Sequence, residues 1–196
     1  EKGASIPEDA PAVLVEDSVK ALGELAEYHR CRFHIPVIAV TGSVGKTSTK
    51  EIIAATLSAG LKVHKTRGNF NNEIGLPLSV LELDDSHQVA VFEMGMRGFG
   101  EIDYLARIVR PDIAVITNIG ISHIERLGSR QNILKAKLEI IRGMKDDGVV
   151  ILNGDDELLS GLRGLLKQNT LFYGMEEFCD VRASDLLSRG EEGISF

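Results

Sequence analysis

The sequence predicts an α/β fold in which a mostly parallel sheet is flanked by helices, a phosphate-binding loop follows the first strand, and a small antiparallel annex lies near the C-terminus. Three observations support this prediction. Short apolar runs alternate with helical patterns, which is typical of βαβ units. A glycine-bearing turn follows the first of these runs. The 196 residues are 43% hydrophobic and 26% charged, a globular composition that suffices for one sizeable core.

Charge and cysteine content exclude several classes of protein. The net charge is −7, from 22 Lys and Arg against 29 Asp and Glu, whereas proteins that coat nucleic acid or anionic membranes need excess positive charge. No apolar run approaches the ~20 residues of a membrane helix, so we expect no membrane insertion. Cys31 and Cys179 are far apart and form no CxxC motif, which is typical of thiols in a reducing compartment. We therefore expect a cytoplasmic protein without a nucleic-acid partner.

The first 35 residues differ from the rest of the chain. The opening EKGASIPEDAPA has neither an initiating Met nor the apolar core of a signal peptide, and we expect the chain to belong to a longer protein. Pro7 and Pro11 indicate an exposed connector. Residues 13–31 then predict a short strand and a helix, with Asp17 or Ser18 as its N-cap. The apolar stripe of this helix is expected to contain Leu22, Leu25 and Ala26.

From Pro36 onward, strand and helix patterns alternate. Continuous apolar runs such as PVIAVT are typical of strands buried on both faces. We expect strands at residues 36–41, 62–66, 88–94, 112–118, 148–153 and 169–174. We expect helices at residues 47–60, closed by Gly60, and at 100–109, 129–144 and 155–166. Residues 181–187 and 193–196 are expected to form the short strands of the annex.

The segment TGSVGKTST predicts a site for nucleotide phosphates. Gly42 and Gly45 allow a tight turn, and successive amides at a helix N-terminus face an anion. Lys46 is placed to reach the β- and γ-phosphates and Thr47 to bind Mg²⁺. The full Walker A pattern also has a glycine five residues before Gly45, where this chain has Val40. A strand, this loop and a helix in succession occur rarely by chance, so we predict a nucleotide site.

A carboxylate near the phosphates is needed to hold Mg²⁺, directly or through water. Glu93 ends an apolar strand, and the carboxyl ends of parallel strands line the ligand crevice of an open α/β sheet. Glu93 is therefore our candidate for a magnesium ligand. The alternative is that it is simply an exposed acid at the end of a strand. Neither DxxG nor NKxD occurs in the chain, which argues against a GTPase.

A lysine breaks the pattern of the helix expected at residues 129–144. Lys135, Glu139 and Arg142 fall on the side expected to face solvent. Lys137 falls within the apolar stripe, where an ammonium is costly unless it is paired or chemically altered. It either extends to the edge and forms an ion pair, or serves as a functional amine whose lowered pKa allows uptake of CO₂ as a carbamate. The apolar stripe is formed by Ile133, Leu134, Ala136, Leu138, Ile140, Ile141 and Met144.

Two further groups of polar residues follow expected strands. His123 is either structural or a neighbour of metal or phosphate. The loop RGNFNNEIGLP holds three asparagines beside Gly68, and turn formation and ligand binding are equally good explanations for them. These residues are Asn69, Asn71 and Asn72.

Taken together, the segments from Pro36 onward resemble the Mur ligases, ATP-dependent amide-bond enzymes of peptidoglycan assembly. Within the family, they are most similar to members that add D-alanyl-D-alanine to UDP-N-acetylmuramoyl-tripeptide. The family commonly has Asn where Val44 stands, a position that contributes mainly backbone. The segments that carry the resemblance are TGSVGKTSTKE, GNFNNEIGLPL, FEMGM, RPDIAVITNIG, SHIERLGS and AKLEI.

The resemblance implies a set of site residues. It implies Mg²⁺ held by Thr47 and Glu93, with His123 at a second Mg²⁺. It also implies that Lys137 is the lysine that the family carbamylates, and that Asn71 and Asn72 lie near the muramoyl substrate. Lys46, His123 and Lys137 are then the expected catalytic residues. The implied ATP-binding residues are Gly42, Ser43, Val44, Gly45, Lys46, Thr47 and Ser48.

The resemblance also implies how the chain is organised and what it does. Residues 1–35 are expected to be the end of an N-terminal substrate domain and a linker. Residues 36–196 are expected to be a central ATP-binding domain, incomplete at its C-terminus and inactive or weak alone. The expected protein is a monomeric, cytoplasmic ligase of cell wall biogenesis, serving cell shape and division. Two alternatives remain: a Mur-like ligase for folylpolyglutamate, cyanophycin or polyglutamate, and an ATP-binding module without ligase activity.

Overall fold

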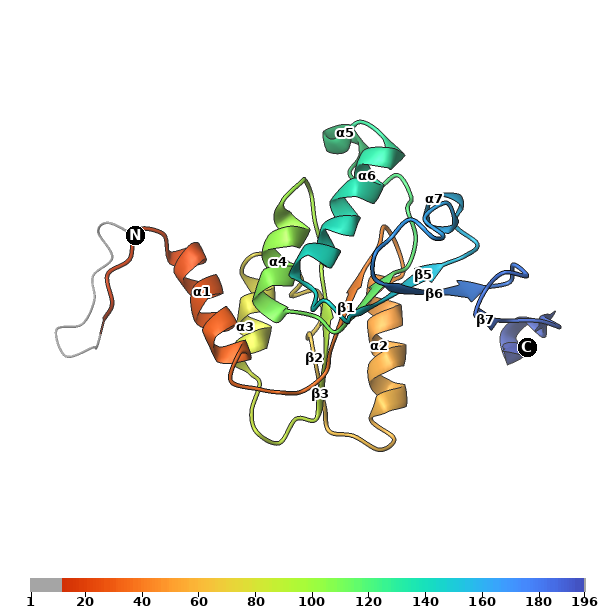
Figure 1. The fold of residues 1–196 in the computed structure, drawn as a ribbon. Coiled ribbons are helices and arrows are strands. Elements are labelled where there is room, and N and C mark those ends of the chain that lie inside the picture. The colour runs from red at the N-terminus through yellow and green to blue at the C-terminus, as the bar shows by residue number, and fades with distance from the viewer. Residues whose placement is uncertain (1–11, 196) are drawn as a thin grey trace.

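The computed structural model describes residues 12–195, so the connector predicted at Pro7 and Pro11 lies outside the described residues. Its centre is a sheet of seven parallel strands with the order β2-β3-β1-β4-β5-β6-β7 (Figure 1). This confirms the predicted α/β class with a mostly parallel sheet. The strands are β1 (Val37–Thr41), β2 (Val63–Lys65), β3 (Val89–Glu93), β4 (Ile113–Ile116), β5 (Val149–Asn153), β6 (Asn169–Gly174) and β7 (Val181–Arg182).

Helices cover both faces of this sheet. α2 lies on one face, and α1, α3, α4 and α6 lie on the other (Figure 1). None of the helices within residues 12–195 has the length and apolarity needed to cross a bilayer. The helices are α1 (Ser18–Arg30), α2 (Lys46–Leu57), α3 (Gly75–Leu81), α4 (Glu101–Val109), α5 (Ile124–Leu127), α6 (Arg130–Lys137) and α7 (Glu157–Ser160), with 3₁₀ turns η1 (Leu138–Gly143) and η2 (Gly190–Glu192).

The central strands are buried on both sides, as their continuous apolar runs predict. Every residue of β1 and β3 is buried. Side chains alternate between the faces of a strand, so Val37 and Ala39 pack with the helices α3 and α4, whereas Ile38 and Val40 pack with α2. The two resulting cores clamp the sheet and fix the positions at which its strands end.

The strand order places a crevice at the carboxyl end of β1. The chain runs outward from β1 to β2, returns through β3, and continues on the other side of β1 as β4. Connections on the two sides of β1 therefore diverge, and such a switch point is where open α/β sheets bind ligands. The loops after β1, β3 and β4 all begin there. They carry the glycine turn, the residues after Glu93, and the segment that leads to His123.

α1 is attached to the main body by polar contacts as well as by packing. Asp17 caps its first turn, as predicted, accepting from the amides of Val19 and Lys20. The buried Arg30 guanidinium donates to three carbonyls, including that of Val109 at 2.9 Å. The predicted apolar stripe is wrong at Leu25, which is 55% exposed. The predicted strand at residues 13–15 does not form, because that segment pairs with no neighbouring strand to satisfy its backbone.

Three further boundaries differ from the prediction. α2 ends at Leu57 with Ser58 as its C-cap, and Gly60 does not have the positive φ of a left-handed cap. The helix predicted at residues 155–166 is limited to α7, followed by turns. The predicted strand at residues 181–187 is divided: β7 extends the main sheet in parallel, and the rest contributes to the annex.

The antiparallel annex itself is confirmed. It consists of β8 (Leu187–Ser188) and β9 (Ile194–Ser195), which pair in antiparallel fashion. It lies next to β7 at the far edge of the molecule from α1 (Figure 1). Because it is remote from the carboxyl end of β1, it contributes nothing to the crevice.

The long helix predicted at residues 129–144 changes character at Leu138, where α6 gives way to η1. A 3₁₀ turn advances roughly 120° per residue instead of 100°, so residues beyond Lys137 rotate relative to the α-helical prediction. Glu139 was expected to face solvent, but it is 5% exposed. Its carboxylate accepts from the amide of Gly100 at 2.9 Å and from that of Asp103 at 3.4 Å. Glu139 therefore caps the start of α4.

We predict that Glu139→Ala lowers the free energy of unfolding by about 1.5–3 kcal/mol, the usual range for a hydrogen-bonded charged group. The substitution removes the acceptor for two amides and leaves a cavity between η1 and α4. Urea denaturation of the variant and the unaltered protein measures the difference. Arg142→Ala, at an exposed position of the same 3₁₀ turn, is the control and should change stability little. Equal effects of the two substitutions would contradict the capping role.

Candidate functional site

The glycine turn after β1 can form only because two of its residues lack a side chain. A Cβ on Gly42 would lie 1.9 Å from Thr117 Oγ1, and Gly42 has φ of 153°. Gly45 has φ of 79° and is the N-cap of α2. Left-handed backbone is strained for residues with a side chain. Both glycines are therefore required for the turn to begin α2 at the carboxyl edge of the sheet.

The loop is held against the end of β4 by Asn118. The amides of Ser43 and Val44 donate to the backbone O and to Oδ1 of Asn118, at 3.1 and 3.0 Å. Asn118 Nδ2 and Thr117 Oγ1 in turn donate to the carbonyl of Val44. Val44 thus contributes backbone only, and its own side chain is 64% exposed.

The first turn of α2 supplies the free donors of this loop. The amides of the first helical residues have no partner within a helix. Within residues 12–195, those of Gly45, Lys46, Thr47 and Ser48 donate to no carbonyl. Two of the amides expected at the phosphates, those of Ser43 and Val44, are instead engaged by Asn118. The arrangement leaves an anion-binding helix start with Lys46 beside it.

Two lysines meet at this loop. Lys46 Nζ lies 3.0 Å from the carbonyl O of Gly42 and 3.4 Å from that of Ser43. Lys137, at the end of α6, is 3% exposed and makes no ion pair or hydrogen bond with another described residue. Burial, and then the nearby charge of Lys46, lower the pKa of Lys137 to about 7. The amine that the sequence placed on the apolar side is therefore buried and influenced by the charge of Lys46, and its pKa lies close to neutral pH.

Glu93 ends β3, next to Val40 of β1, and is 1% exposed. Its Oε1 accepts from Asn71 Nδ2 at 2.7 Å. Its Oε2 is buried, and no described residue donates a hydrogen bond to it. A buried carboxylate oxygen without a donor is costly, and oxygen is the ligand that Mg²⁺ prefers. The carboxylate therefore fits a hard cation, although no three His, Cys, Asp or Glu side chains within residues 12–195 form a ready-made metal cluster.

The sequence left turn formation and ligand binding as two explanations for the asparagines of this loop, and Asn71 and Asn72 each have contacts that bear on them. Asn71 orients Glu93, and its carbonyl accepts from the amide of Gly95 at 2.8 Å. Asn72 Oδ1 accepts from the amides of Ile74 and Gly75 and so starts α3. Both asparagines nevertheless line a cavity of about 260 Å³ together with Lys46 and His123. The same loop therefore both forms a turn and presents side chains to a cavity that can hold a ligand.

His123 is half-buried in left-handed backbone, with φ of 63°, at the N-cap of α5. A left-handed histidine is uncommon and strained. Thr47 lies exposed on the first turn of α2 and does not line the cavity. The structure thus gathers Lys46, Asn71, Asn72 and His123 around one space, with Glu93 bound to Asn71. Lys137 does not line this cavity.

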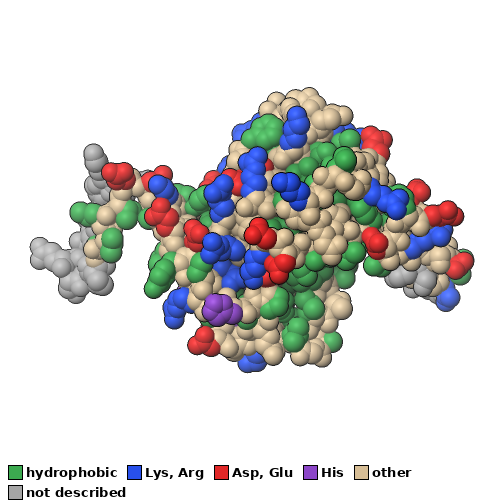
Figure 2. Space-filling model, viewed as in Figure 1, with side chains coloured by type: hydrophobic (Ala, Val, Ile, Leu, Met, Phe, Trp, Pro, Cys, Tyr) green, Lys and Arg blue, Asp and Glu red, His purple; other side chains and the backbone are tan. Residues whose placement is uncertain are grey.

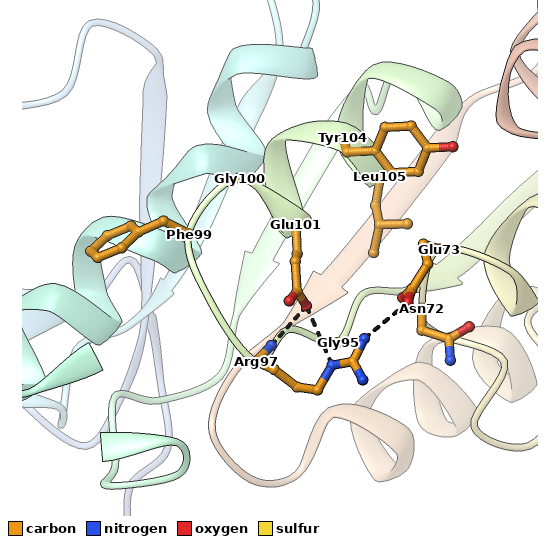
Figure 3. A pocket seen from close by; sticks show the side chains of 9 residues that line it. All are labelled: Asn72, Glu73, Gly95, Arg97, Phe99, Gly100, Glu101, Tyr104 and Leu105. Carbon is orange, nitrogen blue, oxygen red and sulfur yellow. Dashed lines mark hydrogen bonds and ion pairs between the residues drawn. The ribbon is translucent and has the colours of Figure 1, made fainter. Parts of the chain in front are cut away.

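A second cavity of about 300 Å³ adjoins the first and shares Asn72, Gly95, Arg97 and Glu101 with it. Figure 3 shows Arg97 between two carboxylates, pairing with Glu73 at 2.9 Å and with Glu101. Phe99 lies on the loop, and Tyr104 and Leu105 come from α4. Arg97 could not be assigned a role from the sequence, because nothing in the local pattern of residues 95–100 shows that it meets Glu73.

Another hollow, of about 640 Å³, lies away from this crevice, at the C-terminal ends of α4 and η1. Arginines and lysines line it, but Arg107 pairs with Asp103 and Lys145 with Asp112. Figure 2 shows acidic and basic side chains intermingled on the visible face of the molecule. Two of the four cations that line this hollow are thus neutralised by ion pairs, and the phosphate loop does not line it. The crevice at the carboxyl end of β1 is therefore the better candidate site.

Comparisons with known proteins agree with this geometry. A family model described as the Mur ligase middle domain matches residues 40–196. UDP-N-acetylmuramoyl-tripeptide--D-alanyl-D-alanine ligase of Bacillus subtilis is 49% identical over 97% of this chain, which spans 41% of that relative's length. The crystal structure of MurF ligase from Thermotoga maritima in complex with ADP superposes with a TM-score of 0.86, and MurF from Acinetobacter baumannii with 0.85. Both are 37% identical, covering 97% of this chain and 44% of theirs.

The lowered pKa of Lys137 predicts a specific pH dependence of stability. Between about pH 7 and the ordinary lysine pKa of 10.5, the unfolded chain binds more protons at this residue than the folded chain. Stability therefore rises with pH in this window, by up to ~1.4 kcal/mol per pH unit. Lys137→Met should remove that rise, so its gain in stability over the unaltered protein is largest below pH 7 and shrinks towards pH 10.

Denaturant unfolding in CO₂-free buffer between pH 6.5 and 9.5 measures this effect. Lys135→Met is the matched control, because Lys135 lies on the same helix and is exposed; its effect should not vary with pH. A pH dependence that is the same in the Lys137→Met variant and in the unaltered protein would show that Lys137 is charged in the folded state.

Proposed function

The chain belongs to the Mur ligase family, and we propose that it provides the phosphate-binding and acyl-activating site of an ATP-dependent ligase. The ligase would join D-alanyl-D-alanine to UDP-N-acetylmuramoyl-tripeptide in peptidoglycan synthesis, as the names of its relatives state of them. The observation that carries the proposal is the buried amine of Lys137, whose pKa the charge of Lys46 helps to lower, together with the free amides of α2. Because the chain spans 41% of the Bacillus subtilis relative, the activity is proposed for the protein as a whole.

ATP would bind with its phosphates over the first turn of α2. The free amides of residues 45–48 and the helix dipole would hold the anion. Lys46 would swing from the carbonyls of Gly42 and Ser43 to the β- and γ-phosphates. Because phosphoryl transfer depends mainly on positioning and charge neutralisation, this loop would supply most of what the first step needs. Ser43 and Val44 would contribute by keeping the loop anchored to Asn118.

Thr47 and Glu93 are the residues proposed to hold Mg²⁺, and His123 the residue proposed at a second Mg²⁺. The ions would neutralise charge that develops on the transferred phosphoryl group. The uncoordinated Glu93 Oε2 supports this assignment. Asn71 would keep the Glu93 carboxylate in the orientation that presents this oxygen.

Lys137 is proposed to act as a carbamate. Its neutral amine would attack CO₂, forming an N–C bond and releasing a proton to solvent. The side chain would change from a potential cation into an anion and would then stabilise the cations beside the γ-phosphate. A pKa of about 7 makes this chemistry accessible at neutral pH, because only the neutral amine is nucleophilic.

The reaction itself would occur in the two adjoining cavities. A carboxylate oxygen of the tripeptide would attack the γ-phosphorus of ATP, and the bond to ADP would break, giving an acyl phosphate. The amine of the dipeptide would then attack the acyl carbon, and phosphate would leave with formation of the amide. Asn71 and Asn72 are proposed to contact the muramoyl substrate, because they line the cavity beside Lys46 and His123.

We also propose that residues 1–35 end a substrate domain and that residues 36–196 form most of the ATP-binding domain. On this proposal the protein works as a cytoplasmic monomer, and this chain alone is inactive or weak.

Release of ADP in the intact protein tests the proposed function. Addition of ATP, UDP-N-acetylmuramoyl-tripeptide and D-alanyl-D-alanine together should release ADP, and Lys46→Ala should reduce the rate at least ~100-fold, as for removal of other transition-state donors. Folylpolyglutamate, cyanophycin and polyglutamate precursors serve as parallel substrates. Release with one of these instead would identify a different amide ligase. Binding of ATP without release on any substrate would indicate a binding module.

Chemical rescue tests the role of Lys137. Lys137→Ala should abolish ligation, and millimolar formate or acetate should restore part of the activity by placing a carboxylate where the carbamate would lie. Lys135→Ala is the control and should need no rescue. Full activity of Lys137→Ala without added acid would contradict the carbamate.

A further inference from the structure

A second buried lysine, Lys50, has no part in the mechanism above. It lies on α2, one turn after Lys46, and is 0% exposed. Burying an ammonium is expensive unless its donors are satisfied. Lys50 Nζ donates to the carbonyls of Thr66 at 2.7 Å and Gly68 at 3.3 Å, and lies 3.0 Å from Glu51 Oε1. The ammonium is thus fixed beneath the loop that follows β2.

That loop contacts the candidate magnesium ligand, Glu93, at two points. Thr66 donates its amide to the carbonyl of Val91, and its Oγ1 accepts from the amide of Glu93 at 3.1 Å. A few residues later, Asn71 binds the Glu93 carboxylate at 2.7 Å. The loop therefore touches Glu93 at its backbone and at its side chain. Lys50 is the charged group of α2 that binds the loop between these two contacts.

We propose that Lys50 is a positioning residue that sets the phosphate-binding helix at a fixed distance from the Asn71–Glu93 pair. The inference rests on the proposed function, since it assumes that the nucleotide binds at α2 and Mg²⁺ at Glu93. A single side chain that joins both elements makes the geometry of one depend on the other. An apolar residue would fill the same space but would leave the carbonyls of Thr66 and Gly68 without a donor.

A purely structural lysine would make a different contribution. Its loss would weaken the whole fold, and would affect nucleotide binding equally with and without metal. A positioning lysine affects the metal-dependent part of binding, because the groups that orient a ligand typically change metal affinity by 10–100-fold. The ratio between nucleotide affinity in EDTA and in Mg²⁺ therefore distinguishes the two roles.

The experiment uses the intact protein and a non-hydrolysable ATP analogue, with the dissociation constant measured by calorimetry in EDTA and in Mg²⁺. Lys50→Met should reduce the gain in affinity from Mg²⁺ about tenfold or more, with the affinity in EDTA changed by less than about threefold. Lys65→Met is the matched control. Lys65 also pairs with Glu51, but its side chain is 43% exposed and it does not contact the loop, so both affinities should remain unchanged.

An unchanged gain from Mg²⁺ in folded Lys50→Met would overturn the proposal, and so would an equal loss of affinity in EDTA and in Mg²⁺. If Lys50→Met does not fold, Lys50→Gln keeps a donor on a side chain that is one atom shorter, and the same result is expected.

Hydrogen exchange in the unaltered protein is independent of any variant. Mg²⁺ added to the nucleotide complex should slow exchange at residues 66–72, and no slowing there would overturn the proposal. No effect of Mg²⁺ on nucleotide affinity in the unaltered protein would instead overturn the proposed function itself.

Discussion

The site depends on two lysines whose positive charges oppose each other. Lys46 and Lys137 come from different elements, the charge of Lys46 helps to lower the pKa of Lys137, and neither has a carboxylate paired with it among the described residues. Like charges at short range in a buried setting repel, and the repulsion is relieved by losing a proton or by gaining an anion. The crevice is therefore unfavourable for the protein alone and favourable for a polyanion, which is the property expected of a site that binds a triphosphate.

Rigid supports are needed to hold groups that would otherwise separate. Asn118 and Thr117 fasten the phosphate loop to β4, and Glu139 fastens η1 to the start of α4. Each support uses the backbone of its partner, so it fixes position without using a functional side chain. The unfavourable charge arrangement is thereby offset by hydrogen bonds a short distance away, in line with the general observation that strained functional groups persist where their surroundings over-determine them.

The strands and the phosphate loop could be predicted because their signals are local: apolar runs for buried strands, and glycines and a lysine at fixed spacing for the loop. The unusual position of Lys137 could also be predicted from the sequence, because this lysine interrupts an apolar stripe. Glu139 was missed since the change to a 3₁₀ turn alters the periodicity, and that change depends on packing against α4. Asn118, Lys50 and Arg97 could not be assigned because their partners are distant in sequence. The strand expected at residues 13–15 had a suitable composition but no neighbour to pair with.

The donor set at Glu93 has a consequence for the order of binding. One buried carboxylate with a free oxygen, a hydroxyl on an exposed helix turn and a nearby histidine are too few and too dispersed to hold Mg²⁺ tightly by themselves. Phosphate oxygens on the first turn of α2 would complete the coordination. Metal and nucleotide affinity are then linked by a coupling free energy, which is reciprocal by thermodynamic necessity. The same linkage would extend to Lys137, because each added cation favours the anionic carbamate over the amine, so the site would assemble fully only when its substrate is present.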